Sequence, residues 1–301
     1  EYNFPINIKK IGNNRGHLWE QHDLPRYLKK IKNPLLINLT NSAPISYKNK
    51  VSTIHDLSVF ENSNWFSFKY RCFYRFLIPR IIKTSKNILT DSYFIKGEII
   101  KYYPYSSKKI HVVHCATSLN IINNINNDIT EDYLLFVGDS SKRKNLKNLI
   151  DAFIRLDDKN IKLKIVGAKV NHLLLDAISE HASIEYIGDV SNNQLINLYS
   201  NAKILIFPSF YEGFGLPPLE AMSCKCPVII SDIPVLKELC KDAALYINPN
   251  DIQDIKNMIM KLLNDNQLRN HLVDRGLEQS KKYSWVKSAN KIISLIEEIS
   301  K

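Results

Sequence analysis

Two carboxylates stand eight positions apart in the stretch FYEGFGLPPLEAM, which covers residues 210–222. Glu212 and Glu220 enclose two glycines and two adjacent prolines. Carboxylates accept hydrogen bonds, often two at a time, and so suit vicinal hydroxyls, while glycine lets backbone amides approach a phosphate closely. These groups together suit a nucleotide sugar. Proton transfer is a second use of such a pair, and Glu220 alone could simply complement a helix dipole.

A cationic turn, Lys142, Arg143 and Lys144, lies between the apolar run 133–138 and a helix that we expect to begin near Asn145. The amides at a helix N-terminus and the helix dipole favour an anion, and neighbouring cations strengthen that preference. The turn therefore suits phosphate, and a solvated basic turn is the alternative.

The elements that must position these groups alternate along the second half of the chain. Apolar runs predict strands there, with helical segments between most of them, at residues 133–138, 162–167, 184–188, 203–209 and 226–231. Such alternation is typical of a doubly wound α/β domain, in which ligands bind beyond the carboxyl ends of strands. Because one predicted strand ends at Ser209, the acid pair falls at such an end. A helix beginning near Pro217 or Pro218 then places Glu220 in its first turn.

The first half also predicts α/β structure, with strands at residues 33–39, 50–56, 87–92 and 109–114. A Rossmann-like domain normally opens with a strand and a glycine-rich turn. Nothing before Pro34 supplies that unit, so we expect a first βαβ unit to be missing. The polar, asparagine-rich stretch 121–132 is predicted to be a linker between domains at 1–120 and 133–284.

The composition fits a two-domain globular protein, since 301 residues exceed what one core usually supports and 45% of them are hydrophobic. A formal charge of +11 indicates an anionic partner: phosphate groups, an acidic membrane surface or nucleic acid. The five cysteines lack the paired spacing of a zinc site, so we expect reduced thiols in a cytoplasmic protein. No apolar run is long enough to span a membrane.

The segment 68–86 interleaves six lysines and arginines with aromatic side chains and contains no acid. A basic, aromatic, amphipathic helix suits peripheral association with an anionic membrane surface. The alternative is a helix that buries its aromatic side and leaves a basic edge in water. Pro79 argues against one long, uninterrupted helix here.

Several motifs resemble one known family. The stretch FPSFYEGFGLPPLEAMSCKCPVIISDIPVLKELCKDAALYINPND resembles the acid-x7-acid region of retaining GT-B glycosyltransferases of family 4, the glycosyl transferases group 1. FVGDSSKRKNLKNLIDAF is similar to the phosphate loop of that family, in the RKN form of its mannosyltransferase-like members. The resemblance extends over nearly the whole chain, through TIHDLSVFE (53–61), LTDSYFIKGEI (89–99), YIGDVSNNQLINLYSNA (186–202) and YSWVKSANKI (283–292).

The resemblance implies a fold and an activity. The fold would be GT-B, with two Rossmann-like domains facing a cleft: an acceptor-side domain at 1–120, a nucleotide-sugar-binding domain at 133–284 and a helix at 285–301 that crosses back. The activity would be that of a retaining, metal-independent hexosyltransferase without a cofactor. It would move a hexose, mannose favoured, from a GDP- or UDP-linked donor to a saccharide or lipid-linked acceptor. Bacterial surface polysaccharide synthesis, of O-antigen lipopolysaccharide or capsule, at the inner face of the membrane is implied as its setting.

The resemblance also assigns roles to residues. Glu212 would hold the donor sugar hydroxyls and Glu220 the ribose hydroxyls. Arg143 and Lys144 would neutralise the departing diphosphate. The other implied contacts are the main chain at Val190 with the nucleobase, His55 with the transferred sugar, and the backbone of Gly213, Phe214, Gly215 and Leu216 with the sugar and diphosphate. For His55 the alternative is a structural hydrogen-bonded pair with Asp56.

Some positions depart from the family pattern, and because of them we also consider other functions. Asp139 stands where many relatives carry an arginine, Cys115-Ala116 replaces a common asparagine-glycine, and the N-terminal glycine-rich loop is not found. A catalytically inactive subunit that binds nucleotide sugars is therefore an alternative. A basic nucleic-acid-binding protein is a less favoured one, since no recognised motif accompanies the charge, and we expect no nucleic-acid partner.

Overall fold

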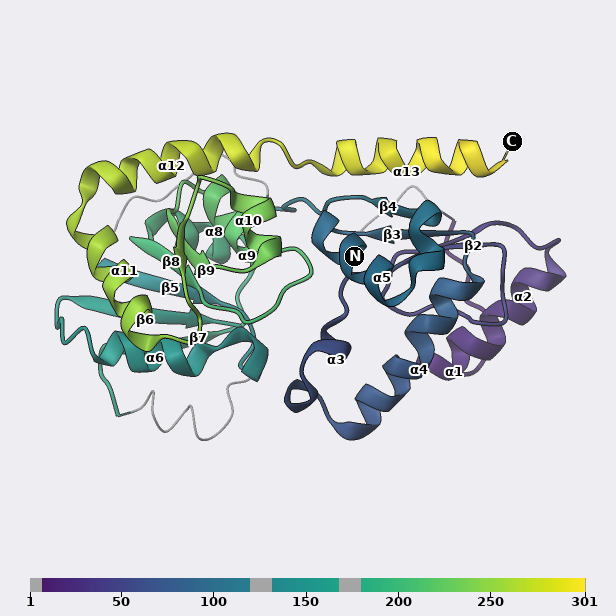
Figure 1. Ribbon diagram of the computed structural model, residues 1–301, viewed down its shortest axis with the longest axis horizontal. Coiled ribbons are helices and arrows are strands. Elements are labelled where there is room, and N and C mark those ends of the chain that lie inside the picture. The colour runs from purple at the N-terminus through teal and green to yellow at the C-terminus, as the bar shows by residue number, and fades with distance from the viewer. Residues whose placement is uncertain (1–6, 120–131, 168–179, 301) are drawn as a thin grey trace. The chain divides into compact units, whose positions relative to one another are not determined.

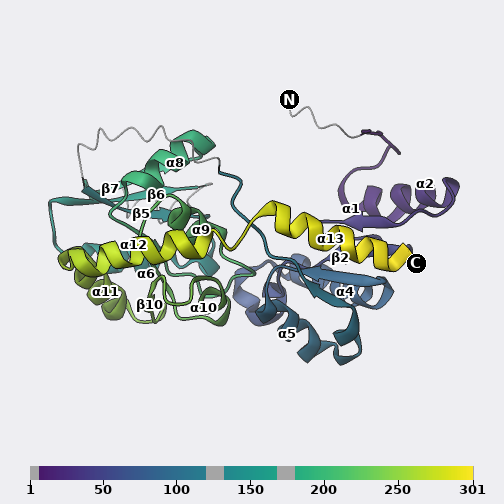
Figure 2. The same ribbon diagram turned by 90° about the horizontal axis from the view of Figure 1, so that it is seen from above.

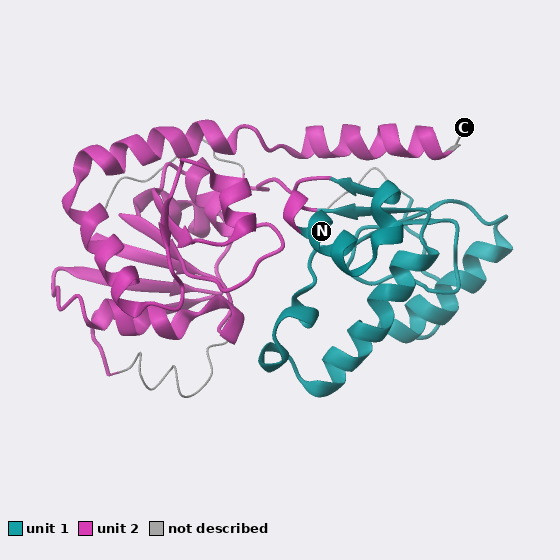
Figure 3. Ribbon diagram, viewed as in Figure 1, with its two compact units in different colours: residues 1–90, 95–112 teal, residues 91–94, 113–301 magenta. Residues whose placement is uncertain are grey.

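Residues 7–119, 132–167 and 180–300 are described by the computed structural model of the chain (Figure 1). Two compact units are present: unit 1 comprises residues 1–90 and 95–112, and unit 2 comprises residues 91–94 and 113–301 (Figure 3). Each unit holds a parallel sheet with helices, so the predicted α/β fold class is confirmed. Most of the predicted linker 121–132 lies outside the described residues and stays a prediction.

Unit 1 is built on four parallel strands in the order β1-β2-β3-β4. All lie inside the predicted ranges: β1 (Leu36–Asn38), β2 (Lys50–Thr53), β3 (Asn87–Thr90) and β4 (Ile110–Val112). The first two residues of helix α5 are counted with unit 2. The helical elements are α1 (Gly16–Leu18), η1 (Trp19–Asp23), α2 (Leu24–Lys30), α3 (Ser58–Glu61), η2 (Ser63–Trp65), α4 (Phe68–Thr84), α5 (Tyr93–Tyr102) and η3 (Pro104–Lys109).

Helix α4 corrects one expectation, because it runs through Pro79 without interruption. A proline inside a helix removes one backbone hydrogen bond. Here buried aliphatic side chains flank it on both sides, namely Leu77, Ile78, Ile81 and Ile82, each at most 2% exposed. Burying each such side chain contributes about 1.5–3 kcal/mol. Their burial therefore outweighs the local cost of the proline.

Unit 2 is built on six parallel strands in the order β10-β9-β8-β5-β6-β7. Five of them match predicted strands: β5 (Asp132–Val137), β6 (Ile161–Val166), β7 (Ile184–Gly188), β8 (Ile204–Phe207) and β9 (Val228–Ser231). The sixth, β10 (Leu245–Ile247), was not predicted. The helical elements are η4 (Lys142–Lys144), α6 (Leu146–Ile154), α8 (Asn192–Asn201), α9 (Leu216–Ser223), α10 (Pro234–Cys240), α11 (Ile252–Asn264), α12 (Asn266–Ser280) and α13 (Trp285–Ser300).

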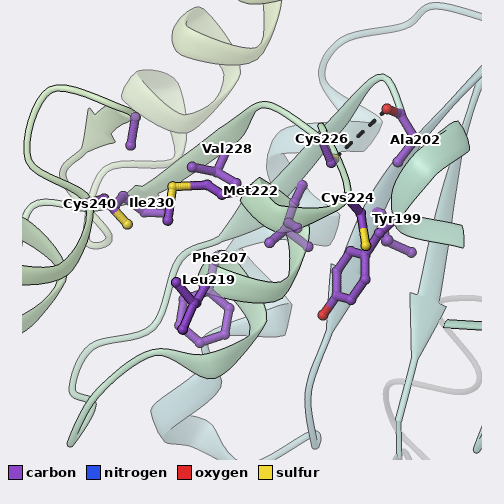
Figure 4. Close-up of a cluster of buried hydrophobic side chains, with 14 of the residues drawn as sticks. Tyr199, Ala202, Phe207, Leu219, Met222, Cys224, Cys226, Val228, Ile230 and Cys240 are labelled. Atoms are coloured by element: carbon purple, nitrogen blue, oxygen red, sulfur yellow. Dashed lines mark hydrogen bonds between the residues drawn. The ribbon is translucent and has the colours of Figure 1, made fainter. Parts of the chain in front are cut away.

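The core of unit 2 lies on both faces of this sheet, because successive strand residues point to opposite sides. On one face, Leu134 and Ile206 pack with α6 and α11, which lie side by side (Figures 1 and 2). On the other face, Leu135 and Phe207 pack with α8, α9 and α10, and part of this cluster is drawn in Figure 4. Both faces are apolar, as expected for strands covered on both sides.

The strand order places a topological switch point between β5 and β8. From β5 the chain builds β6 and β7 on one side of the sheet, and then β8, β9 and β10 on the other. Strands β5 and β8 pair directly, with Leu134 beside Ile204. In open α/β sheets, ligands bind in the crevice outside the carboxyl ends at such a point. The loops that leave these two strands, 138–145 and 208–215, are therefore where a site is expected.

Helix α13 begins at Trp285, where the predicted C-terminal helix begins. Its return to the N-terminal domain stays a prediction.

Candidate active site

Asn145 ends the cationic turn and fixes it to two other loops. Its backbone is left-handed, with a φ of 58°, and α6 begins at the next residue. Asparagine tolerates this conformation better than most side chains do. Its buried amide nitrogen Nδ2 also donates to the carbonyls of Pro208, at 3.0 Å, and Pro249, at 2.7 Å. The turn after β5 is thereby fastened to the loop after β8, as the switch point predicts.

Two further hydrogen bonds join these loops. The amide of Phe210 donates to the carbonyl of Arg143 at 2.9 Å. In return, Nη1 of Arg143 donates to the carbonyl of Tyr211 at 2.8 Å. Buried backbone groups need hydrogen-bond partners, and here each loop donates a hydrogen bond to a carbonyl of the other. These bonds hold the two loops at a defined spacing.

Glu212 lies between the two cations of the turn. Its Oε2 is 3.0 Å from Nη1 of Arg143, and its Oε1 is 2.8 Å from Nζ of Lys144. Glu212 and Lys144 are 7% and 9% exposed, so these are buried, charge-assisted contacts. The ammonium of Lys144 also lies 4.8 Å from the centre of the Phe207 ring. One carboxylate therefore neutralises much of a concentrated positive charge at the carboxyl ends of β5 and β8.

Asp139 adds a second negative charge near this cluster. Burial alone would raise the pKa of this carboxyl. Hydrogen bonds from Ser141 and the charges of Lys144 and Arg143 outweigh burial and lower the pKa below its usual value. Asp139 is therefore ionised at neutral pH and moderates the positive potential of the turn.

Gly215 shapes the loop between the two acids. Its φ of 109° is in a region that side chains disfavour, and a Cβ atom there would lie 2.7 Å from Cδ2 of Leu236. Helix α9 begins at the next residue, Leu216, which is exposed, whereas Phe214 is buried. Pro217 and Pro218 carry no amide N–H, so the backbone N–H groups that could meet an anion here are those of the loop 213–216.

Glu220 lies deeper in α9 than predicted. The helix begins at Leu216 rather than at Pro217 or Pro218, so Glu220 is its fifth residue and the first turn holds no acid. The dipole explanation for Glu220 is therefore wrong. Its Oε2 accepts a hydrogen bond from the hydroxyl of Tyr199 at 3.0 Å. Burial raises the pKa of the Glu220 carboxyl, while the Tyr199 hydrogen bond acts in the opposite direction.

Val190 belongs to unit 2 and His55 to unit 1. Val190 stands between β7 and α8, partly buried against the core and next to Ser191, which caps α8 through a capping box. His55 follows β2 in unit 1, where its amide donates to Oδ1 of Asn41 and its Nε2 lies 3.1 Å from the carbonyl of Leu39. Because a carbonyl only accepts, Nε2 carries the proton. The predicted reach of His55 toward a sugar stays a prediction.

The structure thus brings Arg143, Lys144 and Glu212 together, as a direct ion cluster that the sequence did not predict. Two residues that the structure joins to these groups, Asn145 and Tyr199, were missed as site residues. An asparagine just before an amphipathic helix was the available signal for Asn145, because that residue type favours a left-handed turn. For Tyr199 no signal exists in the sequence, since a tyrosine on an apolar helix face is ordinarily part of the core. In the described residues no group of three His, Cys, Asp or Glu side chains could hold a metal ion, and metal independence stays a prediction.

Comparisons with known proteins agree with this geometry. The family described as "Glycosyl transferases group 1" matches residues 119–279, more than half of the chain. The "O-antigen chain mannosyltransferase RfbU" of Salmonella typhimurium is 35% identical over 75% of this chain and 64% of its own length. The "O-antigen chain mannosyltransferase B" of Escherichia coli is 31% identical over 80% of this chain and 68% of its own length. The chain thus spans about two thirds of these relatives.

Solved structures support the fold. WaaG, described as a glycosyltransferase involved in lipopolysaccharide biosynthesis, superposes with a TM-score of 0.72 at 16% identity, over 91% of this chain and 80% of WaaG. HepE of Anabaena, solved in complex with UDP, gives a TM-score of 0.74 at 15% identity, over 91% of this chain and 81% of HepE. The chain has the GT-B fold and belongs to the glycosyl transferases group 1 family.

Proposed function

We propose that this protein is a retaining glycosyltransferase that moves a hexose, mannose favoured, from a GDP- or UDP-linked donor to a saccharide or lipid-linked acceptor. The observation that carries the proposal is the Arg143–Glu212–Lys144 cluster at the β5–β8 switch point. RfbU and mannosyltransferase B are O-antigen mannosyltransferases by name, which supports mannose and surface polysaccharide synthesis. HepE was solved with UDP, so the base stays open between guanine and uracil.

The donor would be held along the two loops in a fixed order. Arg143 and Lys144 take the diphosphate, because guanidinium and ammonium groups are the natural partners of phosphate oxygens. The backbone from Gly213 to Leu216 approaches the phosphates and sugar. Glu212 and Glu220 then accept hydrogen bonds from the sugar and ribose hydroxyls respectively, and the nucleobase lies at the main chain of Val190.

In the reaction, the bond between the anomeric carbon and the diphosphate oxygen breaks, and negative charge grows on that oxygen. Once the diphosphate has taken over the two cations from Glu212, these cations and the backbone N–H groups of the 213–216 loop stabilise this charge. In this proposal Glu212 accepts hydrogen bonds from the sugar hydroxyls and has no role as a covalent nucleophile. The acceptor would then attack on the face that the diphosphate leaves, with retention at the anomeric carbon and without a metal. His55 would contact the transferred sugar from the N-terminal unit.

A panel of nucleotide sugars tests the proposal by thermal shift, with a chelator present. A ligand that binds only the folded protein raises the melting temperature by mass action. We expect GDP-mannose or its UDP counterpart to do so, and Lys144→Ala to abolish the shift. The matched control is Lys147→Ala, which removes an exposed lysine of the same segment that pairs with Asp151. If no nucleotide sugar shifts the wild-type midpoint, the proposal is wrong. Binding without donor hydrolysis or transfer would instead indicate an inactive subunit.

We also propose that the start of α4 rests on an anionic membrane surface at the cytoplasmic side. In the described residues no helix is both long and apolar enough to span a bilayer. The first three turns of α4 leave four aromatic side chains exposed, by 37–71%: Phe68, Tyr70, Phe73 and Phe76. Cations stand among them, and the guanidinium of Arg80 lies 3.4 Å from the centre of the Phe76 ring. Aromatic side chains that enter the interface beside cations that meet lipid headgroups would bring the enzyme to a lipid-linked acceptor.

Cosedimentation with vesicles tests this surface. Phosphatidylglycerol vesicles should retain the protein and phosphatidylcholine vesicles should not. Phe68→Ser combined with Phe76→Ser should reduce retention severalfold, because the aromatic side chains that enter the interface are lost. Lys29→Ala combined with Lys30→Ala, which removes two exposed cations of α2, should have a much smaller effect. If both double variants lost vesicle retention equally, non-specific attraction by net charge would explain the binding. The proposal would then be wrong.

A further inference from the structure

Tyr199 is a buried tyrosine whose hydroxyl meets a proposed ligand-binding acid. It lies in α8, is 0% exposed, and packs in the apolar cluster beside Cys224 and Cys226 (Figure 4). Its hydroxyl donates to Oε2 of Glu220 at 3.0 Å. In the part of the chain that the structure describes, no other hydrogen bond to this carboxylate is recorded.

In the hydrogen bond between Tyr199 and Glu220, the phenol is the donor and the carboxylate is the acceptor. Burial and the neighbouring Glu220 charge raise the pKa of the Tyr199 phenol well above its ordinary value, so the phenol keeps its proton and remains a donor. A carboxylate that accepts one bond at Oε2 still has free lone-pair directions on both oxygens. A ring held rigidly in the core can therefore set the orientation of an acid that must itself face a ligand.

We propose that Tyr199 is a positioning residue that orients the Glu220 carboxylate to accept hydrogen bonds from both ribose hydroxyls of the donor nucleotide. This inference rests on the proposed binding of the ribose by Glu220. Tyr199 does not touch the nucleotide, since its side chain is fully buried. Without the phenol, the half-buried carboxylate of Glu220 rotates among several orientations, and the hydroxyl bonds lose their alignment. An oriented pair of acceptors lets the site favour a ribonucleotide over a nucleotide that lacks these hydroxyls.

A purely structural role predicts a different outcome. If Tyr199 only fills the core, phenylalanine keeps nearly all of its packing, and any residual damage weakens every ligand alike. If Tyr199 orients Glu220, Tyr199→Phe weakens only ligands that carry ribose hydroxyls. The two roles are therefore separated by comparing ligands with and without ribose hydroxyls, not by measuring protein stability.

The experiment compares GDP with 2′,3′-dideoxy-GDP by calorimetry, and UDP with its dideoxy analogue if UDP binds more tightly. We expect wild type to prefer the ribonucleotide, and Tyr199→Phe to lose about tenfold in GDP affinity while binding dideoxy-GDP unchanged, as for one hydrogen bond to a charged group. In donor hydrolysis KM should rise and kcat should stay, because the ribose is remote from the breaking bond. In a Glu220→Ala background, which removes the acceptor of the Tyr199 hydroxyl, Tyr199→Phe should have no further effect on the preference for GDP over dideoxy-GDP.

The matched control is Tyr133→Phe. Tyr133 is also buried, and its hydroxyl donates to the carbonyl of Leu198, in α8, at 2.8 Å. Tyr133→Phe should leave the preference for GDP over dideoxy-GDP unchanged. Equal weakening of both nucleotides by Tyr199→Phe, or an unaltered preference, would overturn the positioning role. If neither GDP nor UDP bound wild type at all, the proposed function itself would be wrong, so the two failures are distinguishable.

Discussion

Replacing Glu212 by glutamine should weaken the fold and strengthen the binding of a bare diphosphate. The substitution keeps the shape of the side chain but removes the charge that faces Arg143 and Lys144 at 3.0 and 2.8 Å. Each contact is worth roughly 6 kcal/mol of gross attraction at an effective dielectric constant of about 20. Breaking a buried pair costs about 3–5 kcal/mol net, because a charge is left uncompensated. We expect Glu212→Gln to lose about 3 kcal/mol of unfolding free energy.

The second half of this prediction concerns the affinity of the protein for pyrophosphate. In wild type it must share the two cations with the Glu212 carboxylate. Two anions held by one cation lie roughly 6 Å apart, where repulsion is about 3 kcal/mol per charge pair at the same dielectric constant, and about half of that after screening. Removing this repulsion should tighten pyrophosphate binding at least about tenfold. GDP-mannose should gain less, because the amide that replaces the carboxylate in Glu212→Gln offers fewer acceptors to the sugar hydroxyls.

Calorimetry with pyrophosphate, GDP and GDP-mannose measures these affinities, and thermal melting measures the stability. Glu220→Gln is the matched control, since Glu220 accepts from the neutral Tyr199 phenol rather than from a cation. It should leave pyrophosphate affinity unchanged. If pyrophosphate bound Glu212→Gln no more tightly than wild type, the carboxylate would not compete with the diphosphate, and the reasoning would be refuted.

Two further predictions concern stability. Asn145→Ala should destabilise unit 2 by about 3 kcal/mol, because it loses two buried hydrogen bonds and replaces asparagine by a residue that tolerates the left-handed turn less well. Asn145→Gly should cost less, and equal melting temperatures for the two variants would contradict the strain argument. Lys50 is fully buried in unit 1, and burial, with the nearby Lys109 charge, lowers its pKa to about 8. The unfolded chain then binds more protons between about pH 8 and 10.5, so stability rises with pH in that window. In Lys50→Met, urea unfolding at stepped pH should show a smaller rise, because Lys109, whose pKa is also lowered by burial, still contributes. An identical pH profile would show that Lys50 does not titrate there.

Much of the fold follows from local patterns in the sequence. Apolar runs such as 133–138 and 203–209 predicted strands, because a strand covered on both faces needs uninterrupted apolar residues. The strand β10 was missed because LYI is too short to form a distinct run. Helix α4 was predicted to break at Pro79 because local propensity was weighed without the four buried side chains that flank it. Tertiary packing, which the sequence pattern does not display, decided that case.

The site shows the same division between local and long-range information. The sequence placed Arg143, Lys144 and Glu212 each just beyond a predicted strand, because hydrophobic periodicity locates strand ends. It could not say that β5 and β8 are neighbours, since strand order depends on how the whole sheet assembles. For this reason the sequence did not show that Lys144 and Glu212, which are 68 positions apart, form an ion pair.

That long-range pairing changes the expected role of Glu212. From the sequence, Glu212 was predicted to accept hydrogen bonds from hydroxyls, with proton transfer as the alternative. In the folded chain it also neutralises Arg143 and Lys144, the two cations that are proposed to hold the diphosphate. If Glu212 binds the sugar as proposed, the diphosphate must first take over Arg143 and Lys144 and release the carboxylate from them. Sugar recognition would then depend on a diphosphate already in place, so a free hexose should bind weakly to wild type and more tightly once pyrophosphate is present. Titrating mannose with and without pyrophosphate measures this coupling, and the same mannose affinity in both titrations would mean that Glu212 does not exchange partners.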